Sequence, residues 1–321
     1  MRPKLVAIAG VVALGALQPC AAQTYPVKPI RLIVPSSPGG GTDIVGRALA
    51  QKLTELLGQQ VVVENRAGAG TMIGNEIAAK SAPDGYTLLM GLSTLAILPA
   101  VHKTMRYDAL KDLVPISQAV SVPNVLVVHP SLPVRSVKDL IALAKSRPRE
   151  IVGGSAGVGT NPHLSLELFK SMAGIEVVHV PYKGSGPGII GLISGEVALL
   201  IPTLPTAMSH IKAKRVRPLG VSTSVRAESL PQVPTIAEAA LPGYEATQWF
   251  GVLAPAGTPR AVVDRLHKEI VAGLRSADLK QHLANEGAVI VASSPEQFAK
   301  YLRGETDKWA RVVKAAGIKQ E

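Results

Sequence analysis

The amino-acid sequence predicts an α/β fold in which two lobes enclose a hinged cleft. Short apolar runs typical of buried strands alternate with amphipathic helical stretches along almost the whole chain. A proline-rich passage at 114–123 separates two such series, and a strand-like run at 247–254 leads back from the second series to the first. Two crossings between the lobes make one lobe discontinuous, which is the layout of a hinged cleft.

The first series predicts part of a doubly wound sheet. Apolar runs predict its strands, and apolar residues that recur on one helical face predict its helices. Glycines and the turn Pro83-Asp84-Gly85 are typical of the points at which such elements end. We expect strands at 30–34, 61–63 and 86–90, and helices that end at Gly58 and near Lys80.

The second series has the same alternation of strands and helices. We expect strands at 125–128, 150–152, 177–180, 197–201 and 219–222, and helices at 137–145 and 161–173. Two more helices, near 259–275 and 295–316, follow the returning strand. The predicted first lobe therefore comprises 23–120 and 248–321, and the second lobe comprises 121–247.

The first 22 residues are typical of a secretory signal peptide. Arg2 and Lys4 precede an apolar run at 5–17, and small residues follow up to Ala22. The apolar run is shorter than the roughly 20 residues that a transmembrane helix needs. We therefore expect cleavage near Ala22, a periplasmic mature protein, and loss of the single cysteine, Cys20, with the peptide.

The composition favours a protein that binds small anions. The formal net charge of +11 attracts anions in general, but aromatic residues make up only 3% of the chain and no basic run interleaves with stacking rings. Nucleic acid is therefore not an expected partner. The histidines are dispersed without zinc-ligand spacing, and no glycine-rich loop completes a nucleotide or dinucleotide fingerprint. We expect no metal and no cofactor.

The first candidate for anion binding is Gly39-Gly40-Gly41-Thr42-Asp43, which lies between a predicted strand and a predicted helix. Glycines allow the backbone to approach a ligand closely, and the start of a helix presents N–H groups that have no partner within the helix. An anion can be held there without arginine. Alternatively, the segment is an ordinary tight turn with Thr42 or Asp43 as the helix N-cap.

The second candidate is Gly153-Gly154-Ser155-Ala156-Gly157, which fits the Gly-x-Ser-x-Gly pattern of a hydrolase nucleophile elbow. Asp264 followed by His267 or His282 even satisfies the chain order Ser, Asp, His. A secreted serine esterase that uses Ser155 is therefore the main alternative function.

The same glycine-rich stretch also fits a second anion-binding loop. The Ser155 hydroxyl, the backbone N–H groups that follow it and Thr160 at a predicted helix start are suitable donors. His163 lies in the first turn of that helix. Tyr182 and Lys183 follow the next strand and offer an apolar wall with a polar tip and a positive charge. For Tyr182 and Lys183 the alternative is an ordinary solvated loop.

Seven stretches together resemble the receptors of tripartite tricarboxylate transporters, the Bug/TctC family. They occur in the family's order along almost the whole chain that follows the signal peptide. The stretches are Tyr25-Pro-Val-Lys-Pro-Ile30, Pro35-Ser-Ser-Pro-Gly-Gly-Gly-Thr-Asp43, Val63-Glu-Asn-Arg-Ala-Gly-Ala-Gly70, Ala82-Pro-Asp-Gly-Tyr86, Tyr107-Asp-Ala-Leu-Lys-Asp-Leu113, Ser155-Ala-Gly-Val-Gly-Thr160 with His163, and Val180-Pro-Tyr-Lys-Gly184.

The resemblance implies two Rossmann-like lobes joined by two hinge strands, which is the type II-like architecture of periplasmic binding proteins. It also implies a non-enzymatic receptor that holds a small organic carboxylate between two facing loops, 35–43 and 155–160. The expected partners are membrane permease subunits or a sensor kinase, and we expect a monomer. The expected ligand-binding residues are Gly39, Gly40, Thr42, Asp43, Ser93, Ser155, Gly157, Thr160, His163, Tyr182 and Lys183.

Three departures from the family pattern bear on the ligand. Ser36 stands where an aromatic residue is common, and Leu95 and Leu98 replace a frequent His and Asn beside the hydroxyl groups of Ser93 and Thr94. The stretch at 195–203 lacks the acids and the amide that are usual there. A buried acid is what the ammonium group of an amino acid requires. We therefore expect an organic acid that has an apolar body and no amino group.

Overall fold

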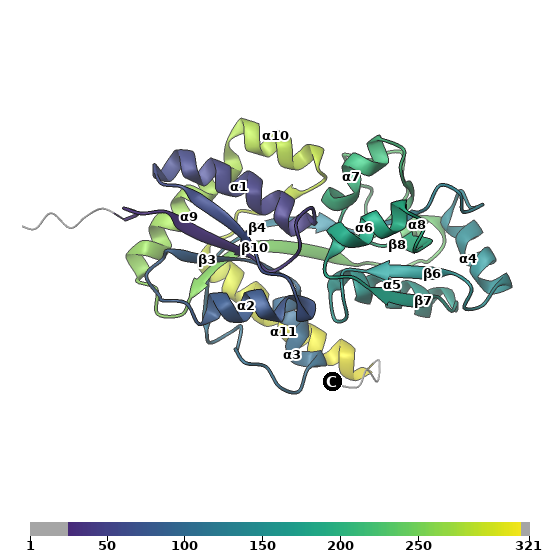
Figure 1. Cartoon of the computed structure of the whole chain (residues 1–321), viewed down its shortest axis with the longest axis horizontal. Helices are drawn as coiled ribbons and strands as arrows, with labels where there is room; N and C mark the ends of the chain where they lie inside the picture. The colour runs from purple at the N-terminus through teal and green to yellow at the C-terminus, as the bar shows by residue number, and fades with distance from the viewer. Residues whose placement is uncertain (1–24, 316–321) are drawn as a thin grey trace, which may run out of the picture.

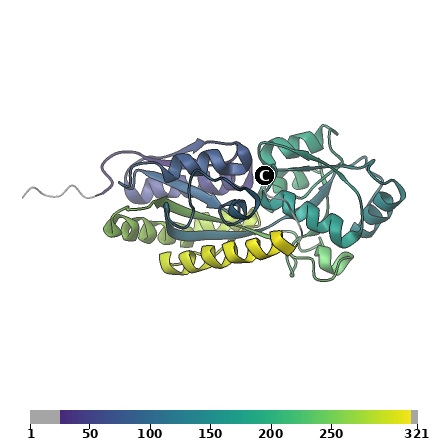
Figure 2. The same ribbon diagram turned by 90° about the horizontal axis from the view of Figure 1, so that it is seen from below.

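The computed structural model describes residues 25–315, which form two lobes side by side (Figures 1 and 2). The strands of the first lobe are β1 (Ile30–Val34), β2 (Val61–Asn65), β3 (Thr87–Leu92), β4 (Leu113–Pro123), β10 (Thr247–Pro255) and β11 (Val289–Ile290). They form one sheet in the order β11-β4-β10-β3-β1-β2, in which β1, β2 and β3 are parallel and β10 is antiparallel to β3 and β4.

Helices cover both faces of this first sheet, as the expected doubly wound arrangement requires. Residues of α1, α9 and α10 pack on one face, and residues of α2, α3 and α11 pack on the other. These helices are α1 (Gly41–Leu57), α2 (Met72–Ala79), α3 (Thr94–Val101), α9 (Arg260–Arg275), α10 (Ala277–Asn285) and α11 (Pro295–Ala315), and a 3-10 turn, η1 (Ala69–Thr71), precedes α2.

The second lobe repeats this layering around a five-stranded sheet. Its strands are β5 (Val125–Val128), β6 (Val152–Ser155), β7 (Val178–Pro181), β8 (Leu199–Leu200) and β9 (Arg217–Val221), in the order β7-β6-β8-β5-β9. Its helices are α4 (Val137–Ser146), α5 (Asn161–Ala173), α6 (Ser185–Ile193), α7 (Leu204–Lys212) and α8 (Ile236–Ala239). Residues of α4, α5 and α8 join one apolar core, and residues of α6 and α7 join another.

The chain passes from one sheet to the other at two adjacent points. Asn124 alone separates β4 from β5, and its backbone N–H donates to Ser222 Oγ over 2.8 Å. On the return, the N–H of Ala246 donates to the carbonyl of Ser222 over 2.9 Å, just before β10 begins. Ser222 therefore ties both crossings together, and the Asn124 side chain donates to Asn161 Oδ1 at the start of α5.

The passage 114–123 differs from its sequence-based interpretation. The prolines suggested a connection between series, but the structure makes this segment part of the 11-residue strand β4, which pairs with β10 and β11. Pro115 lies next to a register shift in the pairing with β10, and Pro123 is the last residue of the strand. At these positions the missing N–H disturbs the ladder least.

Two findings concern the predicted signal peptide and the membrane. Residues 1–22 lie outside the described part of the chain, so the predicted cleavage near Ala22 stays a prediction. Within residues 25–315, no helix has both the length and the apolar character that a membrane span requires.

Candidate functional site: a closed cavity between the lobes

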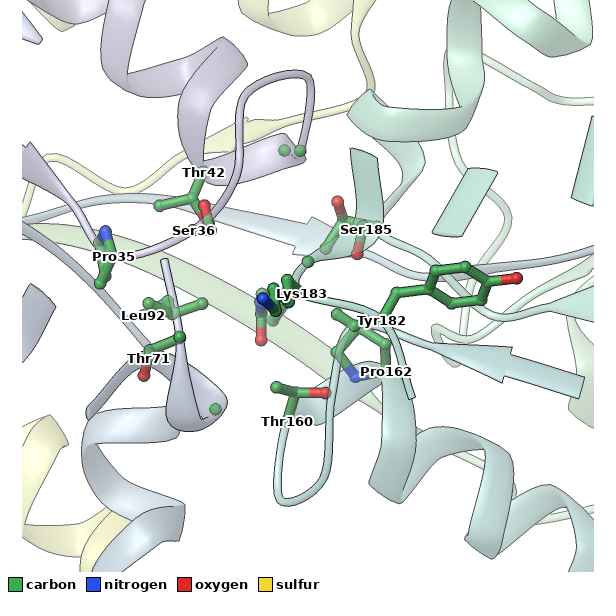
Figure 3. A pocket seen from close by; sticks show the side chains of 18 of the residues that line it. Pro35, Ser36, Thr42, Thr71, Leu92, Thr160, Pro162, Tyr182, Lys183 and Ser185 are labelled. Atoms are coloured by element: carbon green, nitrogen blue, oxygen red, sulfur yellow. The ribbon is translucent and has the colours of Figure 1, made fainter. Parts of the chain in front are cut away.

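A narrow cavity of about 90 Å³ lies where the two lobes meet. In Figure 3, Lys183 lies between Pro35, Thr71 and Leu92 of the first lobe and Pro162 of the second lobe. The cavity is lined by Pro35, Ser36, Gly40, Gly41, Thr42, Gly68, Ala69, Gly70, Thr71, Leu92, Ala156, Thr160, Pro162, Tyr182, Lys183, Gly184, Ser185, Thr203 and Gln248. Lys183 is the one charged residue of this lining.

Five helices from both lobes begin at the cavity. The N-cap residues of α1, α2, α5, α6 and α7 all line it, and they are Gly40, Thr71, Thr160, Gly184 and Thr203. Only Thr160 caps its own helix with its side chain. The first N–H groups of a helix have no partner within it, and the positive end of its dipole lies there. The cavity is therefore an electropositive site that is built mainly from backbone.

The first glycine-rich loop is held in place by Asp43, which is 4% exposed and lies in the first turn of α1. Its carboxylate accepts the N–H of Gly39 over 3.0 Å and the Nδ2 of Asn65 over 2.8 Å, and it pairs with Arg47 at 2.9 Å. Gly39 has a φ of +77°, a conformation that favours glycine. Asp43 therefore shapes the loop that presents Gly40 to the cavity.

The second loop has an internal support of its own. Ser155 is fully buried, its Oγ lies 2.6 Å from His179 Nε2, and it accepts the N–H of Gly157. Thr160 donates to the carbonyl of Gly157 over 2.6 Å. The two polar side chains therefore close the turn that precedes α5.

Two stacked imidazoles lie behind this loop. The rings of His163 and His179 are 4.3 Å apart at an angle of 24°, and His163 Nδ1 accepts the N–H of Gly159. Burial lowers the pKa of His179 to about 4, and the neighbouring His163 adds to this effect. Neither histidine lines the cavity, so both act on the loop from behind.

The predicted esterase triad is not assembled. Ser155 has no exposed surface and contacts His179, whereas Asp264 pairs with Arg260 on α9. His267 Nε2 faces the carbonyl of Ser293, and His282 lies beside α1. All three predicted triad partners of Ser155 therefore belong to helices of the other lobe. His179 lies beside Ser155, but a serine with no exposed surface cannot reach a substrate.

Tyr182 and Lys183 line the cavity in different ways. The Tyr182 ring points away from the cavity in Figure 3 and joins the apolar core formed with α6 and α7. Lys183 is exposed to solvent and also lines the cavity. Its backbone carbonyl accepts the Ser37 hydroxyl from the other lobe, and this bond crosses the cleft.

The lobes are in direct contact on both sides of the cavity. A Cβ atom built on Gly186 would overlap the Pro38 carbonyl oxygen, so the start of α6 touches the first loop. On the other side, a Cβ atom on Gly70 would lie 2.8 Å from the Val158 carbonyl oxygen. These backbone contacts define a closed form of the cleft.

The predicted site residues fall into two groups. Gly40, Thr42, Thr160, Tyr182 and Lys183 line the cavity, whereas Gly39, Asp43, Ser93, Ser155, Gly157 and His163 lie behind it. Sequence reasoning did not single out Thr71, Gly184 or Gln248 as cavity residues, and it noted Thr203 only as a departure from the family pattern. Thr203 begins α7, a helix that the sequence did not predict, whereas Thr71 begins α2, whose end near Lys80 was predicted. Within the described residues, no group of acids, histidines and cysteines could hold a metal ion.

Comparison with known proteins identifies the family to which this site belongs. The sequence model of the tripartite tricarboxylate transporter family receptor, TctC, matches residues 45–318. The chain belongs to this family. The match confirms the resemblance that the seven sequence stretches carry.

Known proteins match the sequence of this receptor along almost its whole length. Protein BugT of Bordetella pertussis (strain Tohama I) is 41% identical over 320 residues, which cover 98% of each chain. Two solved structures have the same fold. R. palustris Rpa4515 with adipate has a TM-score of 0.90 and 40% identity and covers 92% of this chain and 100% of its own. MatC of Rhodopseudomonas palustris with bound malate has a TM-score of 0.84 and 28% identity, and covers 90% and 100% respectively.

Family membership settles the class of function. The receptor is an extracytoplasmic solute-binding protein of the periplasm and not an enzyme. The esterase alternative has no support, in agreement with the buried position of Ser155. The type II-like α/β architecture predicted from the sequence is also confirmed.

Proposed function

We propose that this receptor captures a small organic carboxylate without an amino group and delivers it to the membrane permease subunits of a tripartite transporter. The observation that carries the proposal is the convergence of five helix N-caps on one cavity between the lobes. Backbone N–H groups at helix N-termini are suited to a carboxylate, and no arginine is required.

The lining of the cavity supports an acid rather than an amino acid. None of its residues is Asp or Glu, so an ammonium group would be enclosed without a counter-ion. Leu92, Pro35 and Pro162 supply apolar surface for the body of the ligand. Two related proteins were solved with adipate and with malate, which are both acids without an amino group.

The predicted site residues then divide by role. Gly40, Thr42 and Thr160 contact the carboxylate, and the positive charge of Lys183 attracts it. Asp43 and Ser155 hold the two binding loops with the help of Gly39, Gly157 and His163. The mature receptor begins after cleavage near Ala22. Its lobes comprise 23–120 with 248–321 and 121–247, and it works as a monomer.

Thermal unfolding with a panel of ligands tests this proposal. The panel contains C3–C8 mono-, di- and tricarboxylates, together with aspartate and glutamate as amino-acid controls. A ligand at 100 times its Kd adds about 2.7 kcal/mol of stability, which raises the Tm by several degrees in a chain of this size. The proposal fails if no carboxylate raises the Tm, or if glutamate raises it more than the matched dicarboxylate glutarate.

A further inference from the structure

Gln248 has an unusual place in the cavity. It is the second residue of β10, close to the point where the chain returns to the first lobe, and its side chain is 3% exposed. Its Oε1 accepts the hydroxyl of Ser93, which is the N-cap residue of α3 and is 1% exposed. Gln248 lines the cavity, whereas Ser93 lies behind it.

The hydrogen bond from Ser93 determines which end of the Gln248 amide remains without a partner. A glutamine amide carries an acceptor oxygen and a donor NH₂ group on opposite branches. Because the Ser93 hydroxyl donates to Oε1, the NH₂ group is the free end. Within residues 25–315, Nε2 makes no hydrogen bond. Because Gln248 lines the cavity, this NH₂ group is available to a ligand that enters it.

A second side chain on the cavity wall also carries a donor that makes no hydrogen bond within the described residues. The Ser36 hydroxyl is buried and has no hydrogen-bond partner within the described residues. Ser36 precedes α1 and lies in the first loop, whereas Gln248 lies on a strand that joins the lobes. Two separate elements of the first lobe therefore leave a side-chain donor at the cavity, in addition to the helix N-termini.

We propose that Gln248, oriented by Ser93, determines specificity by donating its N–H to a second carboxylate group of the ligand. The substrate class is then a dicarboxylate, with one carboxylate at the helix N-termini and the other at Gln248. This inference rests on the proposed function, because it assumes that the first carboxylate is held by the backbone. Ser93 is a positioning residue, since it acts through the amide and does not line the cavity.

Paired ligands of equal chain length test the inference by calorimetry. Adipate and hexanoate, and succinate and butyrate, differ only in the second carboxylate. We expect the wild-type receptor to prefer the dicarboxylate of the better-binding pair by about tenfold or more. Gln248→Met keeps the length of the side chain and removes the donor, so the preference should fall to less than about threefold while the monocarboxylate affinity is retained.

Two further variants separate positioning from general damage. Ser93→Ala frees the amide to rotate and should lower the dicarboxylate preference, whereas Ser93→Thr keeps a hydroxyl and should restore it. Gln281→Met is the matched control, because Gln281 is an exposed glutamine of α10 whose amide bonds to Asn285. Gln281→Met should change neither the affinity for the dicarboxylate nor the affinity for the monocarboxylate.

The outcomes distinguish failure of the inference from failure of the proposed function. Binding of hexanoate or butyrate as tightly as the matched dicarboxylate overturns the role of Gln248 and leaves the receptor a carboxylate binder. An equal loss of both ligands in Gln248→Met also overturns it, because such a loss indicates a structural role alone. If neither member of either pair binds, and no carboxylate of the thermal-unfolding panel raises the Tm, the proposed function itself fails.

Discussion

At the scale of a single residue, the buried His179 makes the stability of the second lobe depend on pH. Burial holds its pKa at about 4, below the usual value of 6.5, and the facing groups are His163, Glu167 and Lys170. The unfolded chain takes up this proton near pH 6.5, but the folded chain resists it until about pH 4. Stability from the neutral ring is therefore complete above pH 6.5 and is lost as the pH falls toward 4.

Thermal unfolding between pH 7 and pH 4 checks this expectation. The Tm of the wild-type receptor should fall across this window, and the fall should be smaller in His179→Gln, which keeps a polar side chain near Ser155 and cannot titrate. His129→Gln is a suitable control, because His129 lies on an exposed turn with Ser131. Identical pH profiles for wild type and His179→Gln would refute the assignment.

Asp43 is expected to couple stability to binding. Asp43→Ala removes the acceptor of Gly39 N and Asn65 Nδ2 and leaves those donors without it, at a cost of about 1–3 kcal/mol in unfolding free energy. The loop that presents Gly40 should also loosen, so carboxylate affinity should fall.

Asp139→Ala supplies the comparison for Asp43. Asp139 also lies in the first turn of a helix and accepts a backbone N–H, that of Arg135, but it is on the surface of the second lobe. Chemical denaturation and calorimetry should show a small loss of stability and unchanged affinity. Equal effects of the two substitutions on affinity would contradict the role of Asp43.

The sequence located the two loops at the cavity better than it located the side chains that line the cavity. Glycine-rich motifs indicated 39–43 and 153–157, the family resemblance implied the loops 35–43 and 155–160, and Gly40 and Thr160 do line the cavity. A motif does not tell whether a polar side chain faces the ligand or the backbone of its own loop. Asp43 and Ser155 face the backbone. Gln248 was missed because its partner Ser93 is 155 residues away in the chain.

At the scale of secondary structure, predictability followed exposure. The amphipathic helix at 161–173 was predicted with the bounds that α5 has. By contrast, α3 is buried at every residue except Pro99, so its sequence has no polar face and no helical period. The two-residue strand β11 is too short to show alternation, and β8 was indicated only by the longer apolar run at 197–201. Their pairing in the sheets comes from tertiary contacts.

Helix α6 approaches the first loop closely because Gly186 has no side chain. Gly186→Ala places a Cβ against the Pro38 carbonyl in the closed form, but the second lobe alone has room for it. We expect an unchanged or slightly raised Tm without ligand, because alanine favours a helix over glycine. Carboxylate affinity should fall about tenfold or more, since closure is blocked.

Gly188→Ala is the matched control on the same helix. A Cβ there would make ordinary contacts of 3.5–3.6 Å with Leu200 within its own lobe. Calorimetry should therefore show wild-type affinity for Gly188→Ala. If Gly186→Ala bound as tightly as Gly188→Ala, the contact between α6 and the first loop would not belong to the ligand-bound form.

At the scale of the whole molecule, we expect the two adjacent crossings at Ser222 to act as the hinge between the lobes. A ligand that binds the closed form shifts the population toward it. Solution scattering should therefore give a smaller radius of gyration with saturating dicarboxylate than without it. Gly186→Ala should keep the larger radius in both conditions. A wild-type radius that does not respond to a ligand seen by calorimetry would exclude a hinge motion.

The five helix N-termini at the cavity also affect how such a receptor can change over generations. Their N–H groups belong to the backbone, and every residue except proline supplies one. Substitutions at Ser36, Thr203 or Gln248 can therefore alter the shape and polarity of the cavity while the backbone N–H groups still bind the first carboxylate. A gene duplicate of this receptor could acquire a new substrate through a few cavity substitutions, because affinity for acids is inherited with the fold.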